Sequence, residues 1–430
     1  MDGLDLDLTL NGSAPTGRAL AHGIRVHRGE GLDLATLLPG NRASGVSVEG
    51  RPEVAQLSFG ILPLVDCAPI VVALAHGLFA KYGLQANITK VASWTALRDA
   101  LNSGKLQAAQ MLFGMPIGAA VGKLGTDQKP LVIPWILSRN GQAITLGRKY
   151  RGKIGSDPKL LRPLAFEARD KGRPLVFGIT LAPGTHAMWL RYWLAAGGIH
   201  PDKDLALITV PPPQMVANLR TGRMDGFCVG EPWNTRAIAD DLGFTAIATE
   251  EIWPDHPEKV LAFTEEFAET HPKTVKAVMK ALHEASVWCD DPENHDALAT
   301  LLSQPEYIGA PPEQIRARLG NRLDYGDGRH RADLRGLTFS ARNANYPQAK
   351  HALWWLSQFR RWTMLPLAPD YLGVAARVMR PDFYEAAMRE IGAPHGGLDH
   401  APDTLFDGHT FQPAAPEAYA SALPVTSIHQ

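Results

Sequence analysis

Short apolar strands alternate with helical stretches of about 10–15 residues, and this alternation runs through the chain twice. The first run predicts a strand over Gln56–Leu64, a helix over Ala68–Leu84 and a helix over Trp94–Asn102. The second run follows a basic stretch at 148–173 and predicts a helix over Thr185–Ala196. Such alternation is typical of parallel βαβ units. Two runs of similar size therefore predict an α/β protein with two lobes.

The order of the segments also predicts how the chain divides between these lobes. A strand near 260–267 and a long helix over Lys273–Trp288 would return the chain to the first lobe. We expect a loosely ordered arm at 1–53, a first lobe at 54–147 and 256–390, a second lobe at 148–255 and a C-terminal tail at 391–430. Ligands of open parallel sheets bind beyond the carboxyl ends of the strands. The expected site is the cleft between the lobes, which would close by a hinge motion.

Composition excludes several classes of protein. The 43 basic and 44 acidic residues nearly cancel, which argues against direct binding of nucleic acid or an acidic membrane. The three cysteines, Cys67, Cys228 and Cys289, are scattered, so neither a disulfide framework nor a zinc site is expected. No stretch predicts a membrane span, and the first thirty residues do not resemble an export signal. These features predict a cytoplasmic location, with a periplasmic one as the alternative if the true N-terminus carries a signal.

Motifs for catalysis are missing from the sequence. It contains no GxSxG, GxxxxGK[ST] or HExxH pattern and no dinucleotide-binding fingerprint after the first strand. We therefore expect a binding protein rather than an enzyme, with no catalytic residues, no metal and no cofactor.

Turns between strands and helices offer the best candidates for a binding site. Ser93 and Trp94, the stretch Gly184–His186 and the stretch Val229–Pro232 each lie where a helix begins. Helix N-termini present free N–H groups and the positive end of a dipole, which suits an anion. Gln142 and Lys259 lie near the two predicted crossovers, so they would border the cleft. Ordinary helix capping, a core position for Trp94 and a solvated Lys259 are the alternatives that these patterns leave open.

Several long stretches resemble the substrate-binding components of nitrate and bicarbonate ABC transporters, the NrtA/CmpA family. The resemblance runs from about residue 55 to 410 and is most specific in APGTHAMWLRYWLAAGGIHPDKD and MDGFCVGEPWN. It also includes LVDCAPIVVALAHGLFAKYG, SWTALRD, NGQAI, VPPPQMVANL, DHPEKV and LDYGDGR. The resemblance implies a type II periplasmic-binding-protein fold, which agrees with the two predicted lobes.

The same resemblance implies a nitrate site formed by five residues: Trp94, Gln142, His186, Gly230 and Lys259. Nitrate only accepts hydrogen bonds, and indole, amide, imidazole, backbone and ammonium N–H groups suit it. Bicarbonate carries an O–H group and also needs an acceptor. The bicarbonate binders of the family place a carboxylate where Lys259 stands and use calcium. Lys259 therefore favours nitrate or nitrite and argues against a metal. Glu231, which follows Gly230 in the sequence, could however supply an acceptor.

The family contains two kinds of binding protein that differ in their partners. Because an export signal is not evident, we expect a cytoplasmic nitrate/nitrite sensor (NasS-like) that controls an RNA-binding antiterminator with an ANTAR domain. The alternative is the binding component of a nitrate transporter, whose partners are an ABC permease and its ATPase. An enzyme related to thiamine-pyrimidine synthesis is a third possibility, but the three lone cysteines do not supply the cysteine-rich motif of those enzymes.

Overall fold

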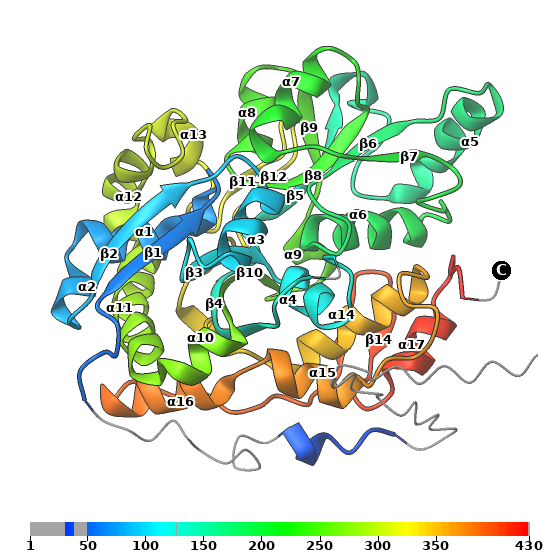
Figure 1. The fold of residues 1–430 in the computed structure, drawn as a ribbon. Helices are drawn as coiled ribbons and strands as arrows, with labels where there is room; N and C mark the ends of the chain where they lie inside the picture. Colours follow the sequence, from blue (N-terminus) through cyan, green and yellow to red (C-terminus); the bar gives the residue numbers. More distant parts are fainter. Residues whose placement is uncertain (1–30, 38–49, 126, 429–430) are drawn as a thin grey trace, which may run out of the picture.

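Two five-stranded sheets organise the molecule, of which the computed structural model describes residues 31–37, 50–125 and 127–428. In the first sheet the strands lie in the order β2 (Gln85–Lys90), β1 (Gln56–Ile61), β3 (Ala108–Leu112), β10 (Pro257–Thr264) and β4 (Leu131–Arg139). In the second the order is β7 (Ala206–Thr209), β6 (Val176–Ile179), β8 (Gly226–Gly230), β5 (Gln142–Gly147) and β9 (Gly243–Ala248). Figure 1 shows the first sheet at the left and the second at the upper right. The prediction of two α/β lobes is thus confirmed.

One strand in each sheet runs against its neighbours. β10 is antiparallel to β3 and β4, and β5 is antiparallel to β8 and β9, whereas β1 pairs in parallel with β2 and β3. These two antiparallel strands are the ones that follow the crossovers between the lobes. A chain entering a lobe from the other side meets the sheet from the opposite end, which accounts for their direction.

The first crossover lies earlier in the chain than the predicted boundary at 147/148. β5 begins at Gln142 and pairs with β8 and β9, so residues 142–147 belong to the second lobe. β4 and β5 are both fully buried and are joined by only two residues, Asn140 and Gly141, so the crossover is too short to be recognised as a linker between lobes.

Helices cover both sheets (Figure 1). Those of the first lobe are α1 (Ala68–Ala75), α2 (Leu78–Lys81), α3 (Trp94–Asn102), α4 (Gly114–Ala120), α10 (Glu265–Thr270), α11 (Pro272–Asp290) and α12 (His295–Leu302), and α13 (Pro312–Arg316) contacts both α12 and the second lobe. Those of the second lobe are α5 (Arg162–Asp170), α6 (Thr185–Ala196), α7 (Met215–Arg220), α8 (Trp233–Ala239) and α9 (Thr249–Ile252). The single helix predicted over 68–84 is divided between α1 and α2 at Gly77, whose φ of 69° lies in the left-handed region and ends a helix.

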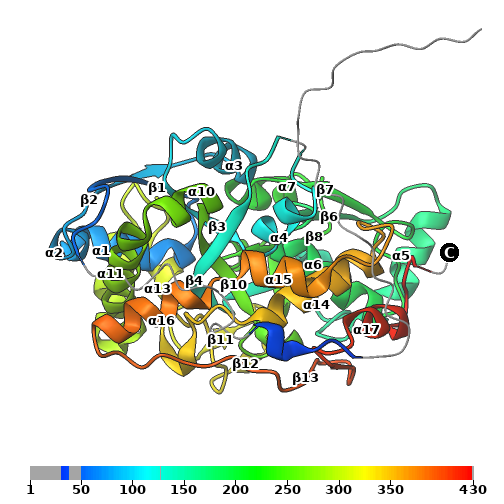
Figure 2. The same ribbon diagram turned by 60° about the horizontal axis from the view of Figure 1, so that its bottom comes forward.

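A third group of helices follows in the C-terminal part: α14 (Ala349–Arg361), α15 (Tyr371–Val378), α16 (Pro381–Glu390) and α17 (Pro416–Ala422). Figure 2 shows α14–α16 running across one face of the molecule. α14 contacts both lobes. The Trp354 and Trp355 rings each lie 5.3 Å from the ring of Trp189 on α6, and the Trp355 ring lies 4.8 Å from that of Phe113, just before α4. The predicted tail is packed rather than loose over its described part, since Glu417 on α17 pairs with Arg360 at 2.8 Å. Most of the predicted arm at 1–53 lies outside the described residues.

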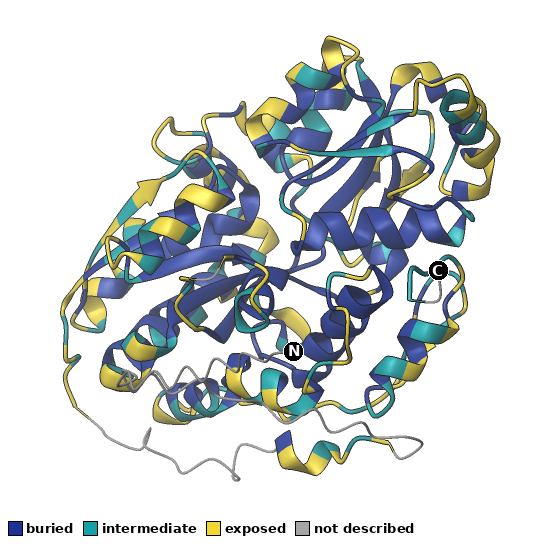
Figure 3. Cartoon of the chain, turned by 45° about the vertical axis from the view of Figure 1, so that its right-hand side comes forward, coloured by how far each residue is buried: buried dark blue, intermediate teal, exposed yellow. Residues whose placement is uncertain are grey.

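Buried residues concentrate in the sheets and in α6 (Figure 3). α6 is buried from Thr185 to Ala195, because it lies between its own sheet on one side and α14 on the other. Its N-terminus therefore lies at the centre of the molecule. No helix among the described residues is long and apolar enough to span a bilayer.

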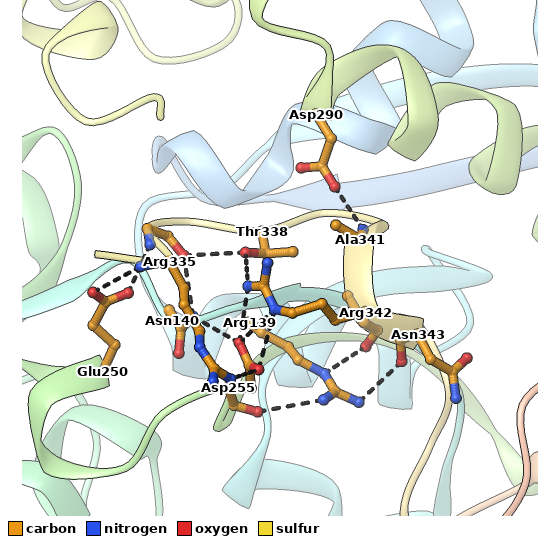
Figure 4. A network of polar contacts seen from close by, with 12 residues as sticks. Arg139, Asn140, Glu250, Asp255, Asp290, Arg335, Thr338, Ala341, Arg342 and Asn343 are labelled. Atoms are coloured by element: carbon orange, nitrogen blue, oxygen red, sulfur yellow. Dashed lines mark hydrogen bonds and ion pairs between the residues drawn. The ribbon is translucent and has the colours of Figure 1, made fainter. Parts of the chain in front are cut away.

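A polar network holds the two crossovers together (Figure 4). Asn140 and Gly141 on the first crossover and Asp255 on the second have φ of 58°, 78° and 59°. The loop at 335–345 covers both: Arg342 Nη2 donates to Asp255 at 2.9 Å, and Arg335 pairs with the same carboxylate. The backbones of Arg139 and Thr338 exchange two hydrogen bonds of 2.9 and 3.1 Å. This loop fixes the region about which the lobes would rotate.

Candidate functional site

The structure brings together all five of the residues that the resemblance implies, at the ends of elements from both lobes. Trp94 begins α3, Gln142 begins β5, His186 lies in the first turn of α6, Gly230 ends β8 and Lys259 lies in β10. Ser93 caps α3 through a 3.1 Å hydrogen bond from Ala96 N, which fixes the indole at the helix start. Each of the four side chains is at most 2% exposed.

His186 and Gln142 form the part of the site that the second lobe contributes. His186 Nε2 lies 2.6 Å from Gln142 Oε1, and Nδ1 lies 2.6 Å from the hydroxyl of Thr180. An amide oxygen only accepts, so Nε2 carries the hydrogen and Nδ1 accepts from Thr180. Burial, followed by the charge of Lys259, lowers the pKa of His186 well below its usual value. The neutral imidazole therefore presents one N–H donor.

Gly230 lets these groups approach the first lobe. A Cβ at this position would lie 2.8 Å from Gln142 Oε1 and 3.3 Å from Asp66 Oδ2. A side chain here would push apart the two halves of the site, so the position needs a residue without one.

Lys259 and Trp94 form the part contributed by the first lobe. Lys259 Nζ lies 5.7 Å from the centre of the Trp94 ring. It also contacts two carboxylates, Asp66 Oδ2 at 3.0 Å and Glu258 Oε1 at 2.6 Å. Burial lowers the pKa of Lys259, but the two carboxylates outweigh it and the pKa is raised, so the ammonium is charged.

Sequence reasoning missed Asp66 and Glu258. Neighbours in a regular strand point to opposite faces, which would place Glu258 away from Lys259. The pairing of β10 with β4 is shifted on both sides of Lys259, and this irregularity brings the two side chains together. The available signals were the adjacent acid in DHPEKV and an acid directly after the first strand in LVDCAP.

Two buried N–H donors of the site have no hydrogen-bond partner among the described residues: Trp94 Nε1 and Gln142 Nε2. Buried donors are nearly always paired, because an unpaired one is costly. Other indole N–H groups of the described chain are also unpaired, but Trp94 is the one whose ring lies beside the Lys259 ammonium. The arrangement therefore offers N–H groups and a cation to an acceptor.

Glu231, the acceptor that the sequence left in question, is engaged elsewhere. Its carboxylate pairs with Arg318 Nε at 3.1 Å and accepts from Thr235 N at 3.1 Å. It therefore faces α8 rather than the five residues.

The lobes meet directly beside the site. Val65 N donates to Glu231 O at 2.9 Å, Trp233 Nε1 donates to Pro63 O at 3.2 Å, and the Thr185 hydroxyl donates to Glu258 Oε1 at 2.6 Å. These bonds join the first lobe to the second. An anion can thus reach the donors only when the lobes separate.

His256, which precedes β10 at the second crossover, predicts acid sensitivity of the fold. It is fully buried beside Thr249, and burial lowers its pKa to about 3. Below pH 6.5 the unfolded chain binds a proton that the folded chain excludes, so stability falls as the pH drops towards 3. Between pH 6.5 and 5 this one group removes about 2 kcal/mol from the free energy of unfolding.

Urea unfolding at pH 7 and pH 5 measures this loss. In His256→Gln the decrease should be smaller by about 2 kcal/mol, whereas a Gln at His330, whose side chain is 67% exposed, should leave it unchanged. Equal decreases in the His256 variant and the unaltered protein would contradict the assignment.

Comparison with known proteins shows the family. The NMT1-like family model matches residues 50–303. The nitrate/nitrite binding protein NrtA of Synechococcus elongatus is 40% identical over 400 residues, which cover 90% of this chain and 90% of that protein. The nitrate import ATP-binding protein NrtC of a Synechocystis species is 39% identical over 369 residues, which cover 85% of this chain but 55% of that protein.

A solved structure extends the likeness to three dimensions. The periplasmic nitrate-binding protein NrtA from Synechocystis superposes with a TM-score of 0.83 at 35% identity, covering 87% of this chain and all of the other. This confirms the type II periplasmic-binding-protein fold. The chain therefore belongs to the NMT1-like family and, within it, to the family of the nitrate-binding protein NrtA.

Proposed function

We propose that this chain binds nitrate or nitrite as the substrate-binding component of an ATP-driven import system. The observation that carries the proposal is the set of N–H donors around Lys259, two of which, Trp94 Nε1 and Gln142 Nε2, have no partner among the described residues. A planar monoanion that only accepts hydrogen bonds satisfies such donors and the ammonium together.

The names of the relatives support import rather than sensing. One relative is named as a nitrate/nitrite binding protein, another as a nitrate import ATP-binding protein, and the solved structure is described as periplasmic. The prediction of a sensor that controls an antiterminator rested on the N-terminal sequence and on family analogy, and none of these names favours it. We therefore take an ABC permease and its ATPase as the expected partners and the periplasm as the expected location. Recovery of the native protein from the cytoplasmic fraction together with an RNA-binding protein would overturn this choice.

Calorimetry with the purified chain tests the ligand. One nitrate or nitrite per chain is the expected stoichiometry, because the five residues form a single site. Bicarbonate is the matched comparison, since it has similar size and charge but carries an O–H group. Heat with bicarbonate and none with nitrate or nitrite would overturn the proposal.

A further inference from the structure

The balance of charge at the site does not favour an anion as it stands. Lys259 is one ammonium facing two carboxyl groups, Asp66 and Glu258. The remaining groups packed here are uncharged or engaged elsewhere. His186 is neutral, burial lowers the pKa of His256 to about 3, and Glu231 pairs with Arg318. A monoanion bound beside Lys259 would therefore add a negative charge to a buried cluster that already holds two acids for one base.

Glu258 is the acid that opposes the anion most directly. Its Oε1 lies 2.6 Å from Lys259 Nζ, the cation that would pair with nitrate, and 3.6 Å from His186 Nε2, whose N–H donates to Gln142. As a carboxylate it competes with the ligand for the Lys259 ammonium.

Glu258 is also the acid with room for a proton. Its Oε1 accepts from Thr185 and Lys259, whereas Oε2 accepts a long hydrogen bond of 3.4 Å from Trp189 Nε1. Both oxygens of Asp66 already accept, Oδ1 from Gln110 and Oδ2 from Lys259. Oε2 of Glu258 is the most open position for a proton.

We propose that Glu258 takes up one proton from solvent when nitrate binds, so that anion and proton enter the site together. The carboxylate becomes a neutral carboxylic acid, no other bond is made or broken, and the net charge of the cluster is unchanged. This inference rests on the proposed function. It also separates nitrate from bicarbonate, because bicarbonate brings a hydrogen of its own that an ionised Glu258 can accept.

The electrostatics of the buried pair agree with this proposal. Burial raises the pKa of Glu258, against the opposing effects of Lys259 and Thr185. A raised pKa keeps an acid protonated to a higher pH. Once the pH exceeds the pKa of Glu258 in the free protein, nitrate must bind together with a proton and binds more weakly as the pH rises. The loss approaches tenfold in affinity for each pH unit when one proton is coupled to one anion.

Calorimetry of nitrate binding in phosphate and in Tris buffer, from pH 6 to pH 9, tests the proposal. The two buffers release protons with different enthalpies, so the difference between the measured heats counts the protons taken up. We expect uptake to rise towards one proton per nitrate with increasing pH. In Glu258→Gln, which resembles the protonated acid, we expect no uptake and an affinity at pH 9 no weaker than at pH 6.

Glu250→Gln is the matched control. Glu250 is a second buried acid whose pKa is raised by burial, but it accepts from Gly336 N and Arg335 N at the hinge rather than from Lys259. This variant should keep the proton uptake. Nitrate heats that are the same in both buffers at every pH would overturn the inference while leaving the proposed function intact. Proton uptake that persists in Glu258→Gln would likewise overturn the inference alone. The absence of any heat with nitrate would overturn the proposed function itself.

Discussion

Replacing Lys259 by glutamate is expected to weaken nitrate binding on the order of a thousandfold. Opposite charges about 4 Å apart attract by about 4 kcal/mol at the effective dielectric constant of a protein, and about 1.4 kcal/mol corresponds to a tenfold change in affinity. The substitution removes this attraction and places a third carboxyl group beside Asp66 and Glu258. Calorimetric titration with nitrate measures the effect.

The same change also removes the cation that compensates two buried acids, so the folding of the variant needs its own control. Lys350 on α14 provides one, because it is 5% exposed and lies between Asp399 at 2.5 Å and Asp403 at 2.8 Å. Lys259→Met and Lys350→Met should both lower the free energy of unfolding, but only the first should weaken nitrate binding. If Lys259→Met keeps the affinity of the unaltered protein, Lys259 does not bind the anion.

Placing a methyl group on Gly114 is expected to hold the lobes apart. A Cβ there would lie 1.8 Å from Pro183 O in the second lobe and 2.6 Å from Trp355 Nε1 on α14. Backbone cannot yield as the end of a side chain does, and overpacking of this kind costs about 1–3 kcal/mol. Gly114→Ala should therefore weaken nitrate binding roughly 10- to 100-fold and enlarge the radius of gyration of the nitrate-bound protein in X-ray scattering.

Gly118→Ala, one turn further along α4, is the control for this prediction. Its Cβ would meet the same proline, but at 3.1 Å from the side-chain Cβ, a contact that a small shift relieves. Both variants replace a glycine of α4 by alanine, but only Gly114→Ala places a methyl group against the backbone of Pro183. Equal affinities for nitrate would show that α4 does not limit closure.

The regular parts of the fold could be predicted because they depend on local pattern. The helices over Trp94–Asn102 and Thr185–Ala196 begin and end where the sequence predicts, since a serine cap or a glycine before the helix, and glycine or polar residues after it, mark their ends. The division of the chain at 147/148 differed from the structure because only two residues, Asn140 and Gly141, join β4 to β5. A crossover this short takes the chain into the other lobe without a linker that the sequence pattern would reveal.

The candidate site also has a part that could be predicted from the sequence and a part that could not. The five residues were identified through a resemblance, and each lies at or near the end of an element, where the two lobes meet. The acids around Lys259 could not be identified, because Asp66 is 193 residues away in the chain and the orientation of Glu258 depends on an irregularity in β10 that alternation does not predict. A pattern locates a cation, but its neutralising partners depend on how distant segments pack.

Complete burial of the four donor side chains determines how a bound anion leaves. An anion enclosed in this way has no route past the side chains, so its residence time is set by how often the lobes part rather than by the strength of its hydrogen bonds alone. A partner that takes the anion from this chain must therefore hold the parted lobes more tightly than the closed ones. Binding of that partner would then drive release of the anion, so a high affinity for the anion need not make its release slow.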